Sequence, residues 1–396
     1  MHQKDVVESF GKKIKDVGEE LFGVPISDIT TLIPGVCLTT FLLVVSMGMG
    51  KIVKIGVIGS VEIQVPEIVL ALLLGILIAN LFSVPNAIVP GSKFSREKLL
   101  KLGIILIGFR LAIGDVFRLG LMSLPIIIAC VGAALVVTYT LSNKLNQSSR
   151  LGALIAVGTS ICGISAIIAA GASIKAKEEE TAYAIASITL FGLVSVFIYP
   201  VLGHILFNGD PTKVGLWMGT SIQDTSQVIG AALAYAEIWD SPLVVEVASL
   251  TKVIRNVFMI VVIPLISIVH YKGIRENIEI GLNSGENGES LRHNYLQYFP
   301  IFIIGFVILS MIRTIGDWRL HSGGEIYGMI DQIGWAQMID YIGQVSNILF
   351  IIALAGVGLS TNLGKIRALG KQAFLIGVAA AAVTGLVSFI LISLTV

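Results

Sequence analysis

Gly219-Thr-Ser-Ile-Gln-Asp-Thr-Ser-Gln-Val-Ile-Gly-Ala-Ala232 is the stretch that decides the fold, and Gly158-Thr-Ser-Ile-Cys-Gly-Ile-Ser-Ala-Ile-Ile-Ala-Ala170 nearly repeats it 61 residues earlier. Both stretches place glycine and hydroxyl residues inside long apolar segments. Such residues allow a helix to unwind, and freed backbone groups are tolerated in a membrane only inside protein or beside water. Matching interruptions are typical of secondary transporters whose site is formed by discontinuous helices. The alternative is that glycine, serine and threonine only let helices pack closely.

The overall composition is that of an integral membrane protein. The chain has 396 residues, of which 55% are hydrophobic and only 13% charged, with a mean hydropathy of +0.89. Soluble domains carry about 25% charged residues. A formal net charge of +1 leaves no basic excess, so the composition excludes nucleic-acid binding. Cys37, Cys130 and Cys162 lie far apart in apolar runs and show no disulfide or zinc-binding pattern.

The apolar segments predict an all-α polytopic membrane protein with about eleven transmembrane helices, because a spanning helix needs about 20 apolar residues. These segments leave room only for short loops, so no soluble enzyme domain is expected. They are residues 31–50, 67–83, 99–112, 119–141, 150–174, 181–207, 214–235, 243–271, 295–315, 341–360 and 369–395.

Residues 1–30 are expected to form an amphipathic interfacial helix, and residues 31–396 a single transmembrane domain. Val6, Phe10 and Ile14 recur at helical spacing, while lysines take other positions. Counting Lys and Arg in alternate loops puts seventeen on the side of the N-terminus and eight on the other. Because cytoplasmic loops collect these residues, the N-terminus is predicted to be cytoplasmic and the C-terminus outside.

A second, weaker repeat pairs Ile107-Gly-Phe-Arg-Leu111 with Ala355-Gly-Val-Gly-Leu359, 248 residues later. Inverted repeats are expected from the matching interruptions. The two offsets differ, so no single duplication explains both repeats, and the repeat boundaries stay open.

Two cations of the segment 243–271 lie far from any loop. Lys252 and Arg255 are three residues apart and share one face of a helix, with Asn256 beside them. Arg255 lies about 18 Å along the helix from Leu243 at 1.5 Å per residue, near the bilayer centre. A cation there costs about 2.5 to 3.5 kcal/mol unless a partner or a water-filled cavity offsets it.

Asp224 is the acid that the sequence places nearest the bilayer centre, opposite these cations. One interpretation is an ion pair of Asp224 with Lys252 or Arg255 that only fixes helix packing. The other is an anion site, because two cations outnumber one carboxylate, arginine binds oxyanions bidentately and lysine adds a point charge. In that case Asp224 takes up a proton, or ligates sodium together with nearby oxygens.

Substrate-binding residues are predicted at both interruptions and on the charged helix: Thr159, Ser160, Cys162, Gly163, Ser165, Thr220, Ser221, Gln223, Thr225, Ser226, Lys252, Arg255 and Asn256. An unwound helix exposes N–H groups and its positive dipole end, which suit an anion. Asp224, Gln227 and Arg110 are predicted to couple or gate. Arg110, at the end of a segment, is equally suited to snorkelling to the interface.

Catalytic signatures do not compete with this interpretation. The five histidines fall at segment ends or in loops, and the sequence contains no HExxH, Walker A or GxSxG pattern. We therefore expect no enzyme activity, no resident metal and no cofactor, apart from a transported sodium ion.

Five motifs together resemble the YeiH family of bacterial membrane proteins, described as sulfate exporters. They are Leu102-Gly-Ile-Ile-Leu-Ile-Gly-Phe-Arg-Leu111, Gly158-Thr-Ser-Ile-Cys-Gly163, Tyr199-Pro200, Gly219-Thr-Ser-Ile-Gln-Asp-Thr-Ser-Gln-Val228 and Lys252-Val-Ile-Arg255. The resemblance runs from about Pro34 to the C-terminus. A proteobacterial member is similar but has His-Glu where this chain has Gln223-Asp224.

The resemblance places the chain near sodium/proton antiporters and bile-acid symporters. It implies a bacterial inner-membrane protein with inverted repeats and crossing discontinuous helices. It also implies a core that moves against a panel, with core helices within 99–271 and 341–396, and a homodimer.

Together these observations predict a secondary active transporter of a small anion, such as sulfate or an organosulfonate. Sodium or protons are expected to drive it by alternating access. The expected partners are the anionic substrate and the lipid bilayer. Two other classes stay open: an anion channel, and a membrane-embedded structural or regulatory protein without transport.

Overall fold

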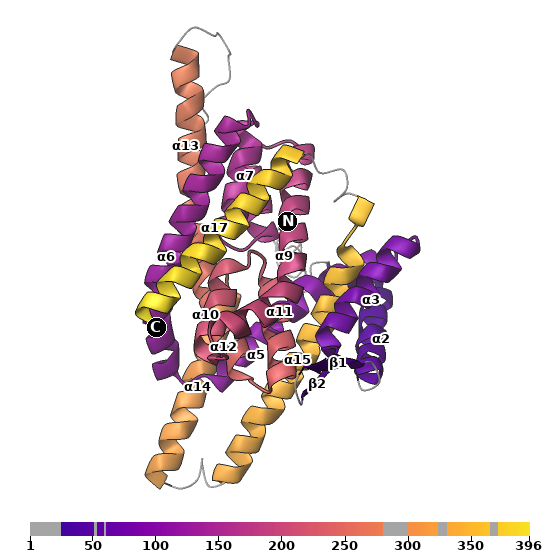
Figure 1. Ribbon diagram of the computed structural model, residues 1–396. Coiled ribbons are helices and arrows are strands. Elements are labelled where there is room, and N and C mark those ends of the chain that lie inside the picture. The colour runs from indigo at the N-terminus through magenta and orange to yellow at the C-terminus, as the bar shows by residue number, and fades with distance from the viewer. Residues whose placement is uncertain (1–24, 51–53, 59–60, 280–299, 324–330, 365–370) are drawn as a thin grey trace, which may run out of the picture. The chain divides into compact units, whose positions relative to one another are not determined.

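The computed structural model describes residues 25–50, 54–58, 61–279, 300–323, 331–364 and 371–396 (Figure 1). Shorter helices and one β hairpin accompany the long helices, and the predicted all-α polytopic class is confirmed. The amphipathic helix expected at 1–30 lies almost entirely outside the described residues. Six helices in the described ranges are long and apolar enough to cross a membrane: Asp28–Gly50, Ile113–Lys144, Glu178–Leu206, Leu243–His270, Gln332–Ser360 and Lys371–Thr395.

The chain forms two compact units. The first contains the described parts of 1–112 and 304–363 together with 237–239, and the second contains those of 113–236, 240–303 and 364–396. Whether 31–396 acts as a single domain, with core helices in 99–271 and 341–396, stays a prediction.

The first unit is built from η1 (Ile26–Leu32), α2 (Ile33–Gly50), α3 (Glu67–Leu81), α4 (Val89–Phe94), η2 (Ser95–Leu99), α5 (Leu100–Ile107), η3 (Gly108–Arg110), α14 (Phe302–Gly323) and α15 (Gln332–Ser360). β1 (Lys54–Ile58) and β2 (Val61–Gln64) form an antiparallel hairpin between α2 and α3. Glycines bring its helices close together, since a side chain at Gly75 of α3 would overlap the α15 backbone at Ala355 and Gly358.

The second unit contains both repeated sequences. Its core joins aliphatic side chains of several helices, among them Ile127, Leu154, Ile167 and Ile263. In Figure 1, α6 and α17 run side by side in this unit. Its helices are α6 (Ile113–Lys144), α7 (Ser149–Ser160), α8 (Ile164–Ser173), α9 (Glu178–Leu206), α10 (Pro211–Ser221), α11 (Thr225–Trp239), α12 (Leu243–Val257), α13 (Met259–Glu279) and α17 (Lys371–Thr395).

The predicted discontinuous helices are confirmed at both repeats. α7 ends at Ser160 and α8 begins at Ile164, directly after Gly163, whose φ of +70° favours glycine. α10 ends at Ser221 and α11 begins at Thr225. Asp224 is the N-cap of α11 and accepts a hydrogen bond from a backbone N–H of its first turn.

The first interrupted pair folds back on itself. A side chain at Gly158 of α7 would overlap Ile167 of α8, and one at Gly171 of α8 would contact Leu154 of α7. Residues further along α7 therefore contact residues nearer the start of α8. α7 and α8 are antiparallel neighbours and form a helical hairpin.

Contacts with α13 show the direction of this first hairpin. At its tip, Cys162 Sγ lies 3.3 Å from Met259 Sδ, at the beginning of α13. At its open end, Ser173 Oγ lies 2.7 Å from Ser267 Oγ, further along α13. The hairpin thus opens toward the C-terminal end of α13.

The second interrupted pair also folds back. α10 packs parallel to α12, because side chains at Gly215 and Gly219 would overlap Val247 and Thr251 in the same order. α12 therefore begins at the level where α10 begins. The chain must return to this level through α11.

Contacts at the end of α11 show this return. Tyr235 Oη lies 3.0 Å from His204 Nδ1 and donates a hydrogen bond of 3.4 Å to the Gly209 carbonyl. His204 lies near the end of α9, and Gly209 lies in the short connection to α10. The end of α11 is therefore close to the beginning of α10. The second hairpin opens toward the N-terminal end of α12.

The two hairpins therefore enter the membrane from opposite sides, and the long helix α9 connects their open ends. Segments 150–174 and 214–235, expected as single spans, each consist of two half-helices that fold back on one another. α7 and α8 contain 12 and 10 residues, together the length of one straight span, so apolar length alone does not separate the two cases. α7 by itself extends about 18 Å, just over half of a hydrocarbon core of about 30 Å.

Candidate functional site

The tips of the two hairpins meet at Gly163 and Asp224. A Cβ atom at Gly163 would lie 2.9 Å from Asp224 Oδ2 and 3.1 Å from Asp224 Cα, closer than real Cβ atoms pack. With its left-handed backbone, Gly163 is thus required for two reasons. These residues are equivalent in the repeats, since each is the sixth residue counted from Gly158 and Gly219.

Lys252 of α12 holds both tips together. Its Nζ donates hydrogen bonds to the carbonyl oxygens of Ile161 in the first tip, at 2.8 Å, and Ile222 in the second, at 3.0 Å. A third bond goes to the Gln223 carbonyl. An ammonium group has three N–H donors, so all three are used. The side chain is completely buried.

Arg255, one turn further along α12, repeats this arrangement. Its Nε donates to the Ser160 carbonyl at 2.9 Å, and its Nη2 donates to the Thr159 carbonyl. Its Nη1 donates to the carbonyls of Thr220 at 2.8 Å and Ile222 at 3.0 Å. The planar guanidinium therefore bridges the ends of α7 and α10 from a fully buried position.

These carbonyls lie at the carboxyl ends of α7 and α10, where a helix offers them no N–H partner of its own. Such groups carry the negative end of the helix dipole, and a cation there is stabilising. Within the described chain, all hydrogen bonds of Lys252 and Arg255 go to backbone carbonyl oxygens. Direct contact of either cation with a substrate stays a prediction.

The accessible side of the tips is formed by the amino ends of α8 and α11. Ser165, in the first turn of α8, is exposed, and Thr225, the first residue of α11, is half-buried. Asp224 is also half-buried, and its Oδ1 accepts the backbone N–H of Ser226 at 2.9 Å and the Ser226 hydroxyl. Two positive helix ends and two hydroxyls therefore face the accessible side, with both cations buried behind them.

Two buried amides border these helix ends. Asn256 Nδ2 lies 3.5 Å from Thr225 Oγ1, while its Oδ1 has no hydrogen-bond partner among the described residues. Gln223 Oε1 likewise has no partner in that part of the chain. The two side chains are only 3% and 1% exposed, so both oxygens lie away from bulk solvent.

Sequence comparisons identify the family. The family model described as Conserved hypothetical protein 698 matches residues 34–377. This chain belongs to that family. It is 30% identical over 310 residues to a UPF0324 membrane protein of Fusobacterium nucleatum, which covers 78% of this chain and 85% of that protein. The resemblance indicated by the five sequence motifs is confirmed.

Other relatives match over similar lengths. A UPF0324 membrane protein of Streptococcus agalactiae is 28% identical over 312 residues, covering 78% of this chain and 84% of the relative. One of Agrobacterium fabrum is 30% identical over 329 residues, covering 83% and 84%. The match to the family model includes both hairpins and α12.

In this family member, three of the predicted hydroxyls bond to the backbone of their own helix. Thr159 Oγ1 donates to the Ile155 carbonyl at 2.7 Å, and Ser160 Oγ to the Val157 carbonyl at 3.2 Å. Thr220 Oγ1 bonds to the carbonyl of Leu216, four residues earlier, at 2.7 Å. They are buried with the cations, as is Ser221, and not on the accessible side.

The predicted coupling residues are distributed differently. Asp224 lies at the tips, whereas Gln227 packs against Gly192 of α9 and donates from Nε2 to the Thr189 carbonyl at 3.2 Å. Arg110 lies in η3 of the other compact unit, with its side chain against Gly343 of α15.

The sequence did not predict the backbone carbonyls as partners of the two cations. Every residue has a backbone carbonyl, so no residue type marks the ones that bind. The sequence also did not predict the sulfur contact of Cys162 with Met259 at the first tip. One usable signal was present: Gly215 and Gly219 are four residues apart, a spacing typical of close helix packing. In the structure this pair brings α10 against α12.

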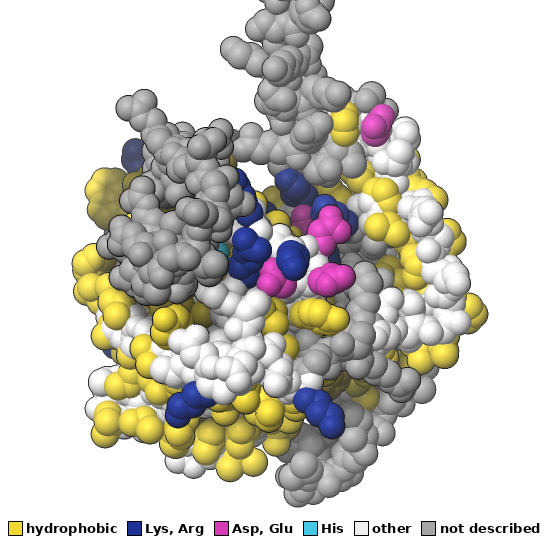
Figure 2. Space-filling view, turned by 90° about the horizontal axis from the view of Figure 1, so that it is seen from above, with side chains coloured by type: hydrophobic (Ala, Val, Ile, Leu, Met, Phe, Trp, Pro, Cys, Tyr) yellow, Lys and Arg dark blue, Asp and Glu magenta, His cyan; other side chains and the backbone are white. Residues whose placement is uncertain are grey.

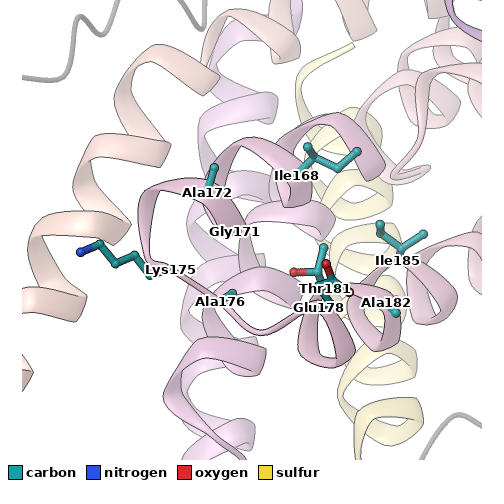
Figure 3. Close-up of a pocket in the computed structure, with 9 residues that line it drawn as sticks. All are labelled: Ile168, Gly171, Ala172, Lys175, Ala176, Glu178, Thr181, Ala182 and Ile185. Atoms are coloured by element: carbon teal, nitrogen blue, oxygen red, sulfur yellow. The ribbon is translucent and has the colours of Figure 1, made fainter.

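A surface cavity of about 430 Å³ lies at the open end of the first hairpin, away from the tips (Figure 3). Ile168 of α8 and Ile185 of α9 are among its mainly apolar lining residues. Figure 3 shows the Lys175 side chain extending away from these two residues. None of the tip residues lines this cavity, so it is separate from the candidate site.

Proposed function

We propose that this protein is a secondary active transporter that carries a small anion across the bacterial inner membrane by alternating access. The observation that supports this most directly is the pair of opposed re-entrant hairpins whose tips meet in the middle of the second unit. Irregular backbone at membrane depth is tolerated where it lines a cavity or site, and this is the arrangement expected around a transported solute.

The charge at the tips favours an anion. Lys252 and Arg255 are buried, and among the described residues Asp224 is the carboxylate that interacts with Lys252, which leaves an excess of positive charge. The amino ends of α8 and α11 add partial positive charge on the accessible side. An oxyanion such as sulfate or an organosulfonate has enough oxygens to accept from both helix ends and from the Ser165 and Thr225 hydroxyls.

The opposed hairpins favour a carrier over a channel. Each hairpin separates the tips from one side of the membrane, so movement of either one opens the site to a single compartment. A channel requires a path that is open to both compartments at once. Alternating opening explains why the fold contains one hairpin from each side.

Charges on the second unit support an orientation. The end where the first hairpin opens carries four basic residues, Lys144, Arg150, Lys175 and Lys177. Lys213 lies near the start of α10, at the opposite end, where the second hairpin opens. Figure 2 shows basic side chains gathered on the upper face, together with acidic ones. By the positive-inside rule, the first hairpin opens to the cytoplasm.

This orientation changes the predicted sides of three lysines. Lys175 and Lys177 become cytoplasmic and Lys213 becomes external, because the two hairpins do not cross. The C-terminus stays outside as predicted, since α17 begins near the cytoplasmic end, where Gln147 bonds to Gln372, and runs away from it. The cytoplasmic position of the N-terminus also stays a prediction.

Counterflow in proteoliposomes tests this function. Vesicles are loaded with unlabelled sulfate, methanesulfonate or acetate, and uptake of the same labelled anion is followed. We expect transient accumulation of at least one labelled anion above equilibrium, which only a carrier produces. Gly132→Ala is the matched control for tip variants, because an added Cβ there has no neighbour within 4 Å. Flux without counterflow indicates a channel, and absence of flux for all three anions contradicts the proposal.

A further inference from the structure

Asp224 places its carboxylate between the amino ends of two helices from different hairpins. Oδ1 accepts from the first turn of its own helix, α11, at Ser226. Oδ2 faces Gly163, the residue that precedes α8. A negative charge at this point already does what an anionic substrate would do there, which is to complement two positive helix ends.

An anion bound at these helix ends therefore competes with the carboxylate. Two like charges a few ångströms apart repel each other. The Asp224 carboxylate is held at the tips by its hydrogen bonds from Ser226. Neutralising Asp224 removes the competition without moving the chain.

The unpaired amides provide a second, independent observation. Asn256 and Gln223 both present a buried oxygen for which the described residues supply no donor, and the Asn256 amide lies against Thr225, the residue after Asp224. An ionised carboxylate only accepts hydrogen bonds, whereas a protonated one has an O–H to donate. Protonation of Asp224 thus adds a donor between Gln223 and Thr225, the residue that Asn256 contacts.

The ligand requirement of each ion makes a proton a better cargo than sodium. The described elements that pack at the tips bring Cys162 from the first hairpin and Lys252 and Arg255 from α12. Tyr199 of α9 and Cys130 of α6 lie near Arg255. A proton and a sodium ion would add the same single positive charge beside these cations. Sodium also needs several oxygen ligands, whereas a proton needs only the Asp224 carboxylate, whose Oδ1 already accepts from Ser226.

We propose that Asp224 takes up one proton when the anion binds, and that the protein carries the anion and this proton together in the same direction. The proton comes from the compartment from which the anion enters. It returns to solution on the other side when the anion leaves and the carboxylate again occupies the two helix ends. This inference rests on the proposed anion transport.

The test uses wild-type proteoliposomes with the membrane potential clamped by potassium and valinomycin. Sulfate and methanesulfonate serve as probes, because neither crosses the bilayer as a neutral acid. At zero potential, an inward gradient of one pH unit should raise the accumulation of the transported anion about tenfold if one proton accompanies it. An inward sodium gradient at equal pH should leave accumulation unchanged.

In Asp224→Asn, the anion exchange that remains should not respond to the pH gradient. Asp240→Asn is the matched control, because Asp240 lies exposed at the other end of α11 and asparagine tolerates its left-handed backbone. Should Asp224→Asn fail to fold, a trapped pH dye in wild-type vesicles still reports whether uptake acidifies the interior.

The outcomes separate the two proposals. If no probe shows counterflow, the anion-carrier function itself fails. If an anion is exchanged but accumulation follows sodium rather than pH, or Asp224→Asn keeps the full pH response, anion transport stands and proton coupling at Asp224 is contradicted.

Discussion

Gly163 and Asp224 occupy equivalent positions in the two repeats, and they face each other where the hairpin tips meet. One position has no room for a side chain, and the other carries the carboxylate of the pair. The two hairpins therefore differ at this position, because only the second has a charged side chain there. This asymmetry links the repeat in the sequence to the proposed transport chemistry.

Replacing Gly163 should disable the site. In Gly163→Ala, the left-handed backbone alone costs about 1–2 kcal/mol, and the new Cβ collides with Asp224 as well. We expect the tips to separate, with counterflow reduced at least tenfold. Thermal stability in detergent should fall modestly, while Gly132→Ala should match wild type in both assays. Normal counterflow in Gly163→Ala would show that contact between the tips is dispensable.

Removing Arg255 should affect folding before transport. Its guanidinium donates to four carbonyls at two helix ends. Arg255→Met removes this donor from all four, and among the described residues only the Ile222 carbonyl keeps another bond, from Lys252. Breaking a buried charged arrangement costs about 3–5 kcal/mol, a large part of total stability. We expect a marked loss of thermal stability measured by tryptophan fluorescence.

The conservative change distinguishes this role from substrate binding. Arg255→Lys keeps the charge but cannot bridge both hairpins, so it should also be destabilised. Arg118→Lys, on the exposed part of α6, is the control and should behave as wild type. Wild-type stability of Arg255→Lys together with a lost anion response would instead assign Arg255 to direct substrate contact.

The sequence predicted much of this fold, for physical reasons. Scarce charge indicated a membrane protein, and glycine and hydroxyls in apolar segments indicated helix interruptions. The cost of burying Lys252 and Arg255 indicated that both need partners. The direction of each half-helix was not predictable, because a folded hairpin and a straight span have the same apolar length. The hydrogen-bond partners of Lys252 and Arg255 were not predictable either. The sequence offered Asp224 as a partner, whereas backbone carbonyls leave no signal in a sequence.

Labelling from the two sides of the membrane tests the hairpin topology. In a Cys37→Ser background, Lys175→Cys and Lys213→Cys are reacted with an impermeant maleimide, since Cys130 and Cys162 are buried. We expect Lys213→Cys to react in intact cells and Lys175→Cys only in inverted vesicles. If both repeats cross the membrane, the two results exchange, so the pattern decides between hairpins and spans.

The most direct measurement of the central claim, that an anion binds at the amino ends of α8 and α11, is protection of a cysteine placed there. Ser165→Cys in the Cys37→Ser background is reacted with a small thiol reagent, with and without a saturating concentration of the anion that shows counterflow. Because Ser165 is exposed in the first turn of α8, we predict ready labelling that slows at least fivefold when the anion is bound. An unchanged labelling rate, in a variant that still exchanges the anion, would contradict the account.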